Sequence, residues 1–89
     1  MEANMPPRIV GVVKAISEPN RICILHQLRK GELCACKLPD RIGLTQPAVS
    51  LHLKVLLKNG LVKVRLNGSN RMYSLTSLGR KVLSDIMRW

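Results

Sequence analysis

Two cysteines one residue apart, Cys34 and Cys36, are the side chains of this sequence best suited to chemistry. Thiolates bind soft metal ions, and a close pair can also form a reversible disulfide. A third interpretation is that both are small buried side chains without a chemical role. Arg29, Lys30 and Lys37 flank the pair, and their positive charge favours the thiolate form. The lysine at 37 favours a redox thiolate and slightly disfavours the binding of a cation, though not of neutral arsenite.

The spacing of the two cysteines limits how they can act together. Side chains two positions apart on an ideal helix point about 200° away from each other. Chelation by Cys34 and Cys36 therefore requires an open helix start, which their place just after Gly31 and Glu32 allows. A metal held between them would distort the helix that follows. Cys23, one predicted helix earlier, is a candidate third ligand, although a small buried side chain is the simpler interpretation.

The charge of the chain indicates an anionic partner. Its 89 residues contain 15 Lys and Arg but only 5 Asp and Glu, which gives a net charge of +10. Nucleic acid is the first candidate partner and an anionic membrane surface the second. With one Tyr, one Trp and no Phe, the chain has few platforms for stacking single-stranded bases, so we expect a duplex binder. The acidic residues are scattered singly, and no nucleophile–base set or phosphate loop is evident, so we expect no enzyme.

Length and cysteine count indicate one cytoplasmic domain over residues 1–89. No signal peptide and no apolar run of spanning length is evident, so we expect no membrane partner. Three cysteines, an odd number, argue against a secreted disulfide framework. A domain this small buries a thin core, and dimerisation is a common remedy.

The elements that must position the thiols follow from hydrophobic spacing and turn residues. After a loose leader at 1–6, helices are predicted over 7–16, 19–30, 34–43, 45–59 and 77–89. Two alternating runs around Asn67-Gly68 predict a β-hairpin over 61–76. The first helix repeats apolar residues at Ile9, Val12, Val13 and Ile16, and the last at Leu78, Val82, Ile86 and Trp89. The fold class is therefore mainly α with a two-stranded wing, a winged helix-turn-helix.

The helix over 45–59 is the clearest element. Thr45 is a suitable N-cap, and Asn59-Gly60 is a typical stop. One buried stripe is predicted, made of Val49, Leu53 and Leu56. Helix-turn-helix proteins present the N-terminal half of such a helix to base edges in the major groove. The candidate DNA-binding residues of this helix are Thr45, Gln46, Pro47, Ser50, Leu51 and Lys54.

Individual roles follow from side-chain chemistry. Gln46 can contact adenine through two hydrogen bonds, and Ser50 can contact a base or a phosphate. Lys54 is better placed for phosphate. Leu51 either meets a thymine methyl group or is a single exposed leucine without a role. His52, at the edge of the buried stripe, is interpreted as a hydrogen-bonded packing residue rather than a metal ligand.

The predicted hairpin is strongly basic. Lys63, Arg65 and Arg71 lie on it without an acidic residue. Such a run can simply protect a sheet edge. A wing whose arginines reach phosphate or the minor groove fits the charge better. The candidate DNA-binding residues here are Arg65, Asn70 and Arg71.

The sequence resembles the ArsR/SmtB family of metal-sensing repressors over roughly residues 8–76. The resemblance rests on "SEPNRICIL", "GELCACKL", "GLTQPAVSLHLKVLLKNGLVKVR" and "GSNRMYSLT". It implies a homodimer joined through the helices over 7–16 and 77–89, bound to a pseudo-palindromic operator in double-stranded DNA. It also implies that an inducer lowers DNA affinity. No obligatory cofactor is implied.

The Cys-x-Cys pair is similar to that of the subset that senses arsenic, antimony or other soft metals. That motif usually reads Glu-Leu-Cys-Val-Cys-Asp-Leu, whereas this chain has Ala35 and Lys37. Pro39 stands where some arsenic sensors have a further cysteine. The last helix offers only Asp85, so zinc sensing there is not expected.

The function predicted from the sequence is a DNA-binding repressor released when As(III), Sb(III) or a soft metal binds Cys34 and Cys36. The first alternative is a repressor on the same scaffold that responds to oxidation. The others are a metal-independent basic protein that binds RNA or the ribosome, and a winged-helix module that has lost DNA binding.

Overall fold

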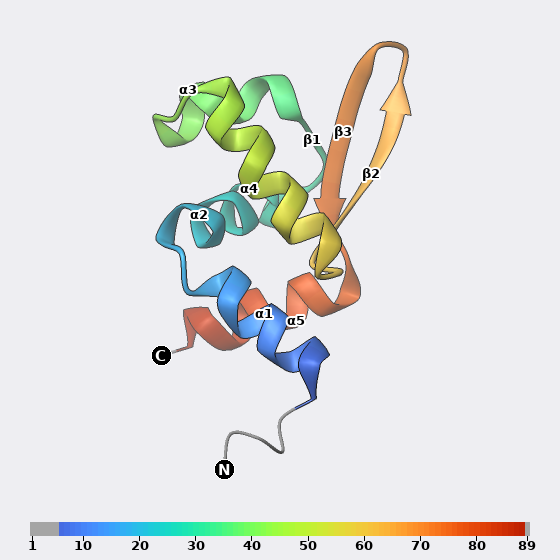
Figure 1. Ribbon diagram of the computed structural model, residues 1–89. Coiled ribbons are helices and arrows are strands. Elements are labelled where there is room, and N and C mark those ends of the chain that lie inside the picture. Colours follow the sequence, from blue (N-terminus) through green and yellow to red (C-terminus); the bar gives the residue numbers. More distant parts are fainter. Residues whose placement is uncertain (1–5, 89) are drawn as a thin grey trace.

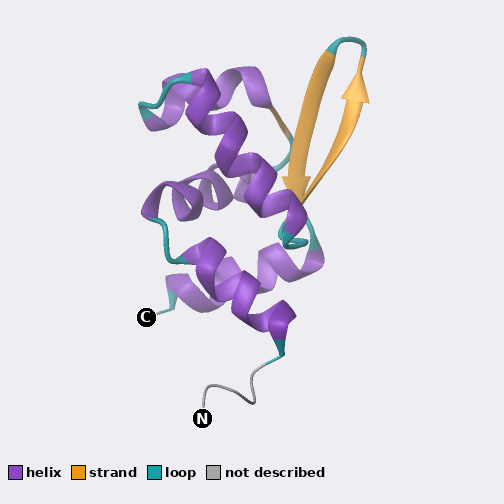
Figure 2. Ribbon diagram, viewed as in Figure 1, coloured by secondary structure: helices purple, strands orange, loops and turns teal. Residues whose placement is uncertain are grey.

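A computed structural model describes residues 6–88 as a helical body from which a β-hairpin projects (Figure 1). Figure 2 shows the two long strands standing apart from the helices. The predicted winged helix-turn-helix is confirmed. The elements are α1 (Pro7–Ile16), α2 (Pro19–Gln27), the 3₁₀ turn η2 (Leu28–Lys30), β1 (Leu33–Cys34), the 3₁₀ turn η3 (Ala35–Lys37), α3 (Leu38–Ile42), α4 (Gln46–Lys58), β2 (Val62–Asn67), β3 (Asn70–Leu75) and α5 (Ser77–Met87).

The helix boundaries follow the capping residues of the sequence. Glu18 caps α2 by accepting a hydrogen bond from the backbone N–H of Asn20, and Pro19 occupies the first turn. Thr45 caps α4 through a hydrogen bond of 3.3 Å from the N–H of Ala48, and Asn59 ends that helix. These side chains satisfy N–H groups that have no partner within the helix. The predicted bounds of the first helix (7–16) and the fourth helix (45–59) agree with α1 and α4 to within a residue at each end. Of the predicted leader, residues 1–5 lie outside the described residues.

The third helix differs from its prediction over 34–43. The α-helical part covers only Leu38–Ile42, after the 3₁₀ turn. Cys34 has an extended backbone, with φ −66° and ψ 137°. Pro39 lies in the first turn of α3, where proline is tolerated. The helix ends at Gly43, whose left-handed conformation at φ 70° favours glycine.

The sheet has three strands rather than the two that were predicted. Its order is β1-β3-β2, and both pairs are antiparallel. The additional strand β1 is only two residues long, so it has no alternating pattern that could reveal it. It pairs Leu33 with Tyr73 and Cys34 with Met72. The segment that contains the first thiol is therefore part of the wing sheet.

The core lies where α2, α4 and the base of the hairpin meet. Fully buried side chains include Ile24, Leu25, Leu28, Leu38 and Leu56. The predicted stripe of α4, namely Val49, Leu53 and Leu56, is buried as expected.

Two predicted apolar stripes are only partly buried in the single chain: Val12, Ile16 and Val82 pack against the core, but other members are exposed. In α1 only Ala15 is buried, while Ile9 and Val13 are exposed. In α5 the buried residues are Gly79 and Leu83, and Leu78 is exposed. Trp89 lies outside the described residues. Both helices are at the end of the molecule opposite the hairpin tip (Figure 1). Within residues 6–88, no helix is long and apolar enough to cross a membrane.

Candidate nucleic-acid interface and thiol site

The outward face of α4 presents the predicted DNA-binding residues to solvent. All six of them are exposed: Thr45, Gln46, Pro47, Ser50, Leu51 and Lys54. The hydroxyl of Thr45 already accepts the capping hydrogen bond, so this side chain orients the first turn. Leu51 is 63% exposed, an unusual position for a large apolar side chain. The surface can therefore offer hydrogen bonds, charge and one apolar contact to a groove.

The wing lies on the same side of the molecule as the start of α4. In Figure 1 the hairpin tip and the N-terminal end of α4 both point to the upper end of the view. Arg65, Asn70 and Arg71 are all exposed on the hairpin. Leu66 is 67% exposed although alternation suggested an inward position, because this part of the hairpin extends beyond the helical body. Leu66 is a candidate groove contact that the sequence did not single out.

One carboxylate engages the wing, contrary to the expectation from the hairpin alone. Arg65 donates from Nε to Oε2 of Glu32 at 2.7 Å and from Nη2 to Oε1 at 2.8 Å. These hydrogen bonds, and then the positive charges of Arg65 and Lys63, hold the pKa of Glu32 below its ordinary value. The same pair raises the pKa of Arg65, which is charged in any case. Glu32 and Arg65 are 33 positions apart in the chain, which explains why no local pattern reveals the pair.

The two thiol positions face each other. The structure joins Cys34 and Cys36 in a disulfide, with Cα atoms 5.1 Å apart. The backbone N–H of Cys36 also donates to Sγ of Cys34 at 3.2 Å. This approach is possible because Cys34 lies on β1, outside the helix, so the opposed directions of an ideal helix do not apply. Cys34 is buried and Cys36 is exposed, so a reagent can enter from the side of Cys36.

Cys23 does not join this pair. It is an exposed free cysteine on α2, so the interpretation as a small buried side chain is wrong. Among the described residues, no three His, Cys, Asp or Glu side chains lie close enough together to hold a metal ion. Cys34 and Cys36 are therefore the two sulfur ligands that this part of the chain brings together.

His52 connects α4 with Arg21 of α2. Its Nδ1 lies 3.2 Å from Nη1 of Arg21, whose Nε donates to the carbonyl of Ala15 at 2.6 Å. Arg21 thus joins the end of α1 to α4. The predicted packing role of His52 is confirmed.

Comparison with known proteins places the chain in a family. A profile of the bacterial regulatory protein, arsR family, matches residues 18–64. The chain belongs to the ArsR family. It is 45% identical over 64 residues to the arsenical resistance operon repressor of Staphylococcus xylosus, which covers 72% of this chain and 62% of that protein. The chain thus spans less than two thirds of that relative.

A further relative and two solved structures are similar over most of this ArsR chain. The transcriptional activator HlyU of Vibrio cholerae is 33% identical over 87 residues, which is 98% of this chain and 80% of HlyU. The structure of reduced HlyU superposes with a TM-score of 0.82 at 30% identity, over 91% of this chain and 86% of that one. A homodimeric winged helix-turn-helix DNA-binding domain from Mycobacterium bovis superposes with a TM-score of 0.83 at 23% identity, over 90% and 75%. These proteins are transcriptional regulators and DNA-binding domains, not enzymes.

Proposed function

We propose that this chain is a DNA-binding transcriptional repressor that acts as a homodimer and leaves its operator when Cys34 and Cys36 react. The exposed reading face of α4 and the basic wing support duplex binding. The net charge of +10 provides the attraction to phosphate that such binding requires. The ArsR relatives support a regulatory role.

The observation that carries the thiol control is the pairing of β1 with β3. Cys34 lies opposite Met72, on the wing strand that leads from Arg71 into the core. Because strands of one sheet share backbone hydrogen bonds, a change of backbone at Cys34 acts on the position of β3. Reaction at the thiols thereby changes how the wing meets DNA.

The exposed apolar faces of α1 and α5 support a dimer interface formed by these two helices. Ile9 and Val13 of α1 and Leu78 and Met87 of α5 are exposed, and a second copy of the chain would cover such apolar side chains. The homodimeric Mycobacterium bovis domain has the same fold. A twofold dimer presents two reading helices, so the operator is expected to be a pseudo-palindrome.

As(III), Sb(III) or a soft metal is the first candidate inducer. The sulfur atoms of Cys34 and Cys36 are close enough to form a disulfide. In the reduced protein they are therefore also close enough to bind the same As(III), Sb(III) or metal atom. The Staphylococcus xylosus relative is an arsenical resistance operon repressor, which agrees with this choice.

Oxidation is the second candidate signal at the same two residues. The disulfide joins them without any ligand. HlyU, which has been solved in a reduced form, is a transcriptional activator. The sign of regulation therefore needs its own test, by transcription from the operator with and without the protein.

Selection from a random duplex library tests DNA binding. Reduced protein is expected to enrich an inverted repeat whose half-sites are about one helical turn apart or a multiple of it. Sedimentation of the complex should give two chains per site. No enrichment, together with equal affinity for single-stranded RNA, would support the basic RNA-binding alternative instead.

A further inference from the structure

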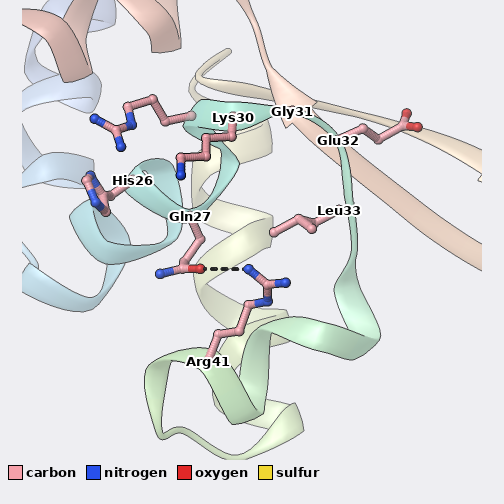
Figure 3. A pocket seen from close by; sticks show the side chains of 8 residues that line it. His26, Gln27, Lys30, Gly31, Glu32, Leu33 and Arg41 are labelled. Atoms are coloured by element: carbon pink, nitrogen blue, oxygen red, sulfur yellow. Dashed lines mark hydrogen bonds between the residues drawn. The ribbon is translucent and has the colours of Figure 1, made fainter.

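A pocket of about 430 Å³ lies between the end of α2 and α3, away from the reading face (Figure 3). Its walls come from α2, η2, the turn that follows, the start of β1 and α3, and no residue of α4, β2 or β3 lines it. The side chains that matter here are His26, Gln27, Arg29, Lys30, Leu33 and Arg41. The DNA-binding candidates and the two thiols lie outside this set.

The pocket concentrates positive charge that the described chain does not neutralise. Arg29, Lys30 and Arg41 line it. Glu32 is the one acidic residue of the lining, but its carboxylate is bound to Arg65 and points away from the pocket in Figure 3. Within residues 6–88, no ion pair involves Lys30 or Arg41. Cations that converge on a concave surface raise the local concentration of anions.

Neutral polar groups complete the lining. Arg41 donates from Nη1 to Oε1 of Gln27 at 3.3 Å, so the amide NH₂ of Gln27 stays free to donate to a ligand. His26 lines the same pocket, and its Nδ1 is buried without a hydrogen-bond partner among the described residues. Leu33 lies between the polar groups and adds an apolar surface (Figure 3). The set therefore consists of donors and one apolar wall, without a free acceptor carboxylate.

We propose that this pocket binds a small molecule with at least two negative charges, carried by phosphate or carboxylate groups. Guanidinium groups bind both kinds of oxyanion through paired hydrogen bonds. The volume exceeds that of a single phosphate and falls in the lower part of the range of small-molecule sites, roughly 300–1,000 Å³. A phosphate of the DNA backbone is the less suitable occupant, because none of the DNA-binding candidates of α4 and of the β2–β3 hairpin lines the pocket. The proposal does not depend on thiol sensing.

Binding there would restrain the segment that leads to the thiols. Arg29, Lys30 and Gly31 form one wall, and Cys34 follows three residues later. An anion held by Lys30 on one wall and Arg41 on the other would join this segment to α3. The pocket thus offers a second input to the same loop.

Backbone-amide NMR of the full chain tests the proposal with two probes. Pyrophosphate and citrate are titrated separately at constant ionic strength, with chloride as the reference anion. One or both probes should shift the amides of residues 27–33 and 41 in a saturable way. Saturation by pyrophosphate alone would assign phosphate groups, and saturation by citrate alone would assign carboxylates.

Matched variants locate the site. Lys30→Gln and Arg41→Gln should each raise the dissociation constant at least about tenfold, since each removes a charged donor. Lys81→Gln, which removes an exposed charge on α5, should leave it unchanged. If Arg41→Gln disturbs folding, the dissociation constant measured for Lys30→Gln alone tests the proposal.

Three results would overturn the proposal. The first is the absence of saturable shifts with either probe. The second is an equal loss of binding in Lys81→Gln, which would mean that the probes respond to general charge. The third is a loss of duplex-DNA affinity in Lys30→Gln and Arg41→Gln with unchanged probe binding, which would assign the pocket to the DNA backbone.

Discussion

Glu32 and Arg65 form an ion pair with two hydrogen bonds, which connects the segment before Cys34 to the wing. Glu32 lies two residues before Cys34, and Arg65 is on β2. The pair adds a side-chain connection to the backbone pairing between β1 and β3. Because both side chains are exposed, it contributes little to stability. Its consequence is that a DNA phosphate has to compete with Glu32 for Arg65.

Replacing Glu32 should therefore strengthen DNA binding. We expect Glu32→Gln to raise affinity for duplex DNA about two- to fivefold, because Arg65 no longer has to leave a carboxylate before it binds a DNA phosphate. The slope of log affinity against log salt should become steeper by about one phosphate contact. Fluorescence anisotropy at several salt concentrations measures both.

Asp85→Asn is the matched control for this charge change. It removes one negative charge on α5, far from the wing in the chain, where Asp85 pairs with Lys81 and Arg88. If Asp85→Asn gains as much affinity as Glu32→Gln, net charge explains the effect and the specific competition is wrong.

The pair should also be visible in the titration of Glu32. Arg65 holds the pKa of Glu32 below the ordinary glutamate value of about 4.3. The ion pair therefore stabilises the fold at a pH above this ordinary value, where the carboxylate is charged. This contribution is lost as the pH falls through the depressed pKa of the folded state. Side-chain carboxyl NMR should give a midpoint below that of an unpaired glutamate, and Arg65→Gln should raise it. An unchanged midpoint in Arg65→Gln would show that the pair does not form in solution.

Base reading by Gln46 makes a separate prediction. Gln46→Ala should weaken binding to the selected operator by about 1–3 kcal/mol and have little effect on random DNA. Arg71→Ala should weaken both and flatten the salt dependence by about one contact, because a phosphate contact carries no sequence information. Equal losses on both DNAs in Gln46→Ala would reject Gln46 as a base reader. An unchanged salt slope in Arg71→Ala would remove Arg71 from the phosphate contacts.

Gly79 should be required for the packing of α5 against the body. A Cβ at this position would collide with the backbone carbonyl of Leu61, which cannot move away as a flexible side chain can. We expect Gly79→Ala to lower the free energy of unfolding by about 1–3 kcal/mol despite the higher helix propensity of alanine. Urea denaturation at fixed protein concentration measures this, with the exposed Ser84→Ala on the same helix as control. A Gly79→Ala variant as stable as Ser84→Ala would contradict the close approach.

The parts of the fold that were predictable depend on local signals. Thr45, the apolar stripe of α4 and Asn59-Gly60 specify one helix within the segment 45–60, and the structure agrees. The turn around Gly68 specifies the hairpin in the same way. Each signal lies within one element, so it needs no knowledge of the tertiary arrangement.

The parts that were missed depend on residues distant in the chain. Strand β1 forms because Leu33 and Cys34 pair with β3, which lies far away in the sequence. Glu32 likewise pairs with Arg65, which is 33 positions away. The apolar stripe expected on α5 includes Leu78, which is exposed, whereas Leu83 packs inward. Periodicity identifies an apolar face but not whether the chain itself or a second copy covers it.

The central claim is that the thiols control DNA affinity, and one titration tests it most directly. Operator affinity is measured by anisotropy for reduced protein, for reduced protein with arsenite and for oxidised protein, each beside Cys34→Ser and Cys23→Ser. We expect arsenite to weaken binding at least about tenfold, with the effect lost in Cys34→Ser and kept in Cys23→Ser. Release by oxidation alone would identify the redox alternative on the same residues. Affinity that stays constant in all three states would contradict thiol control and leave Cys34 and Cys36 as structural residues.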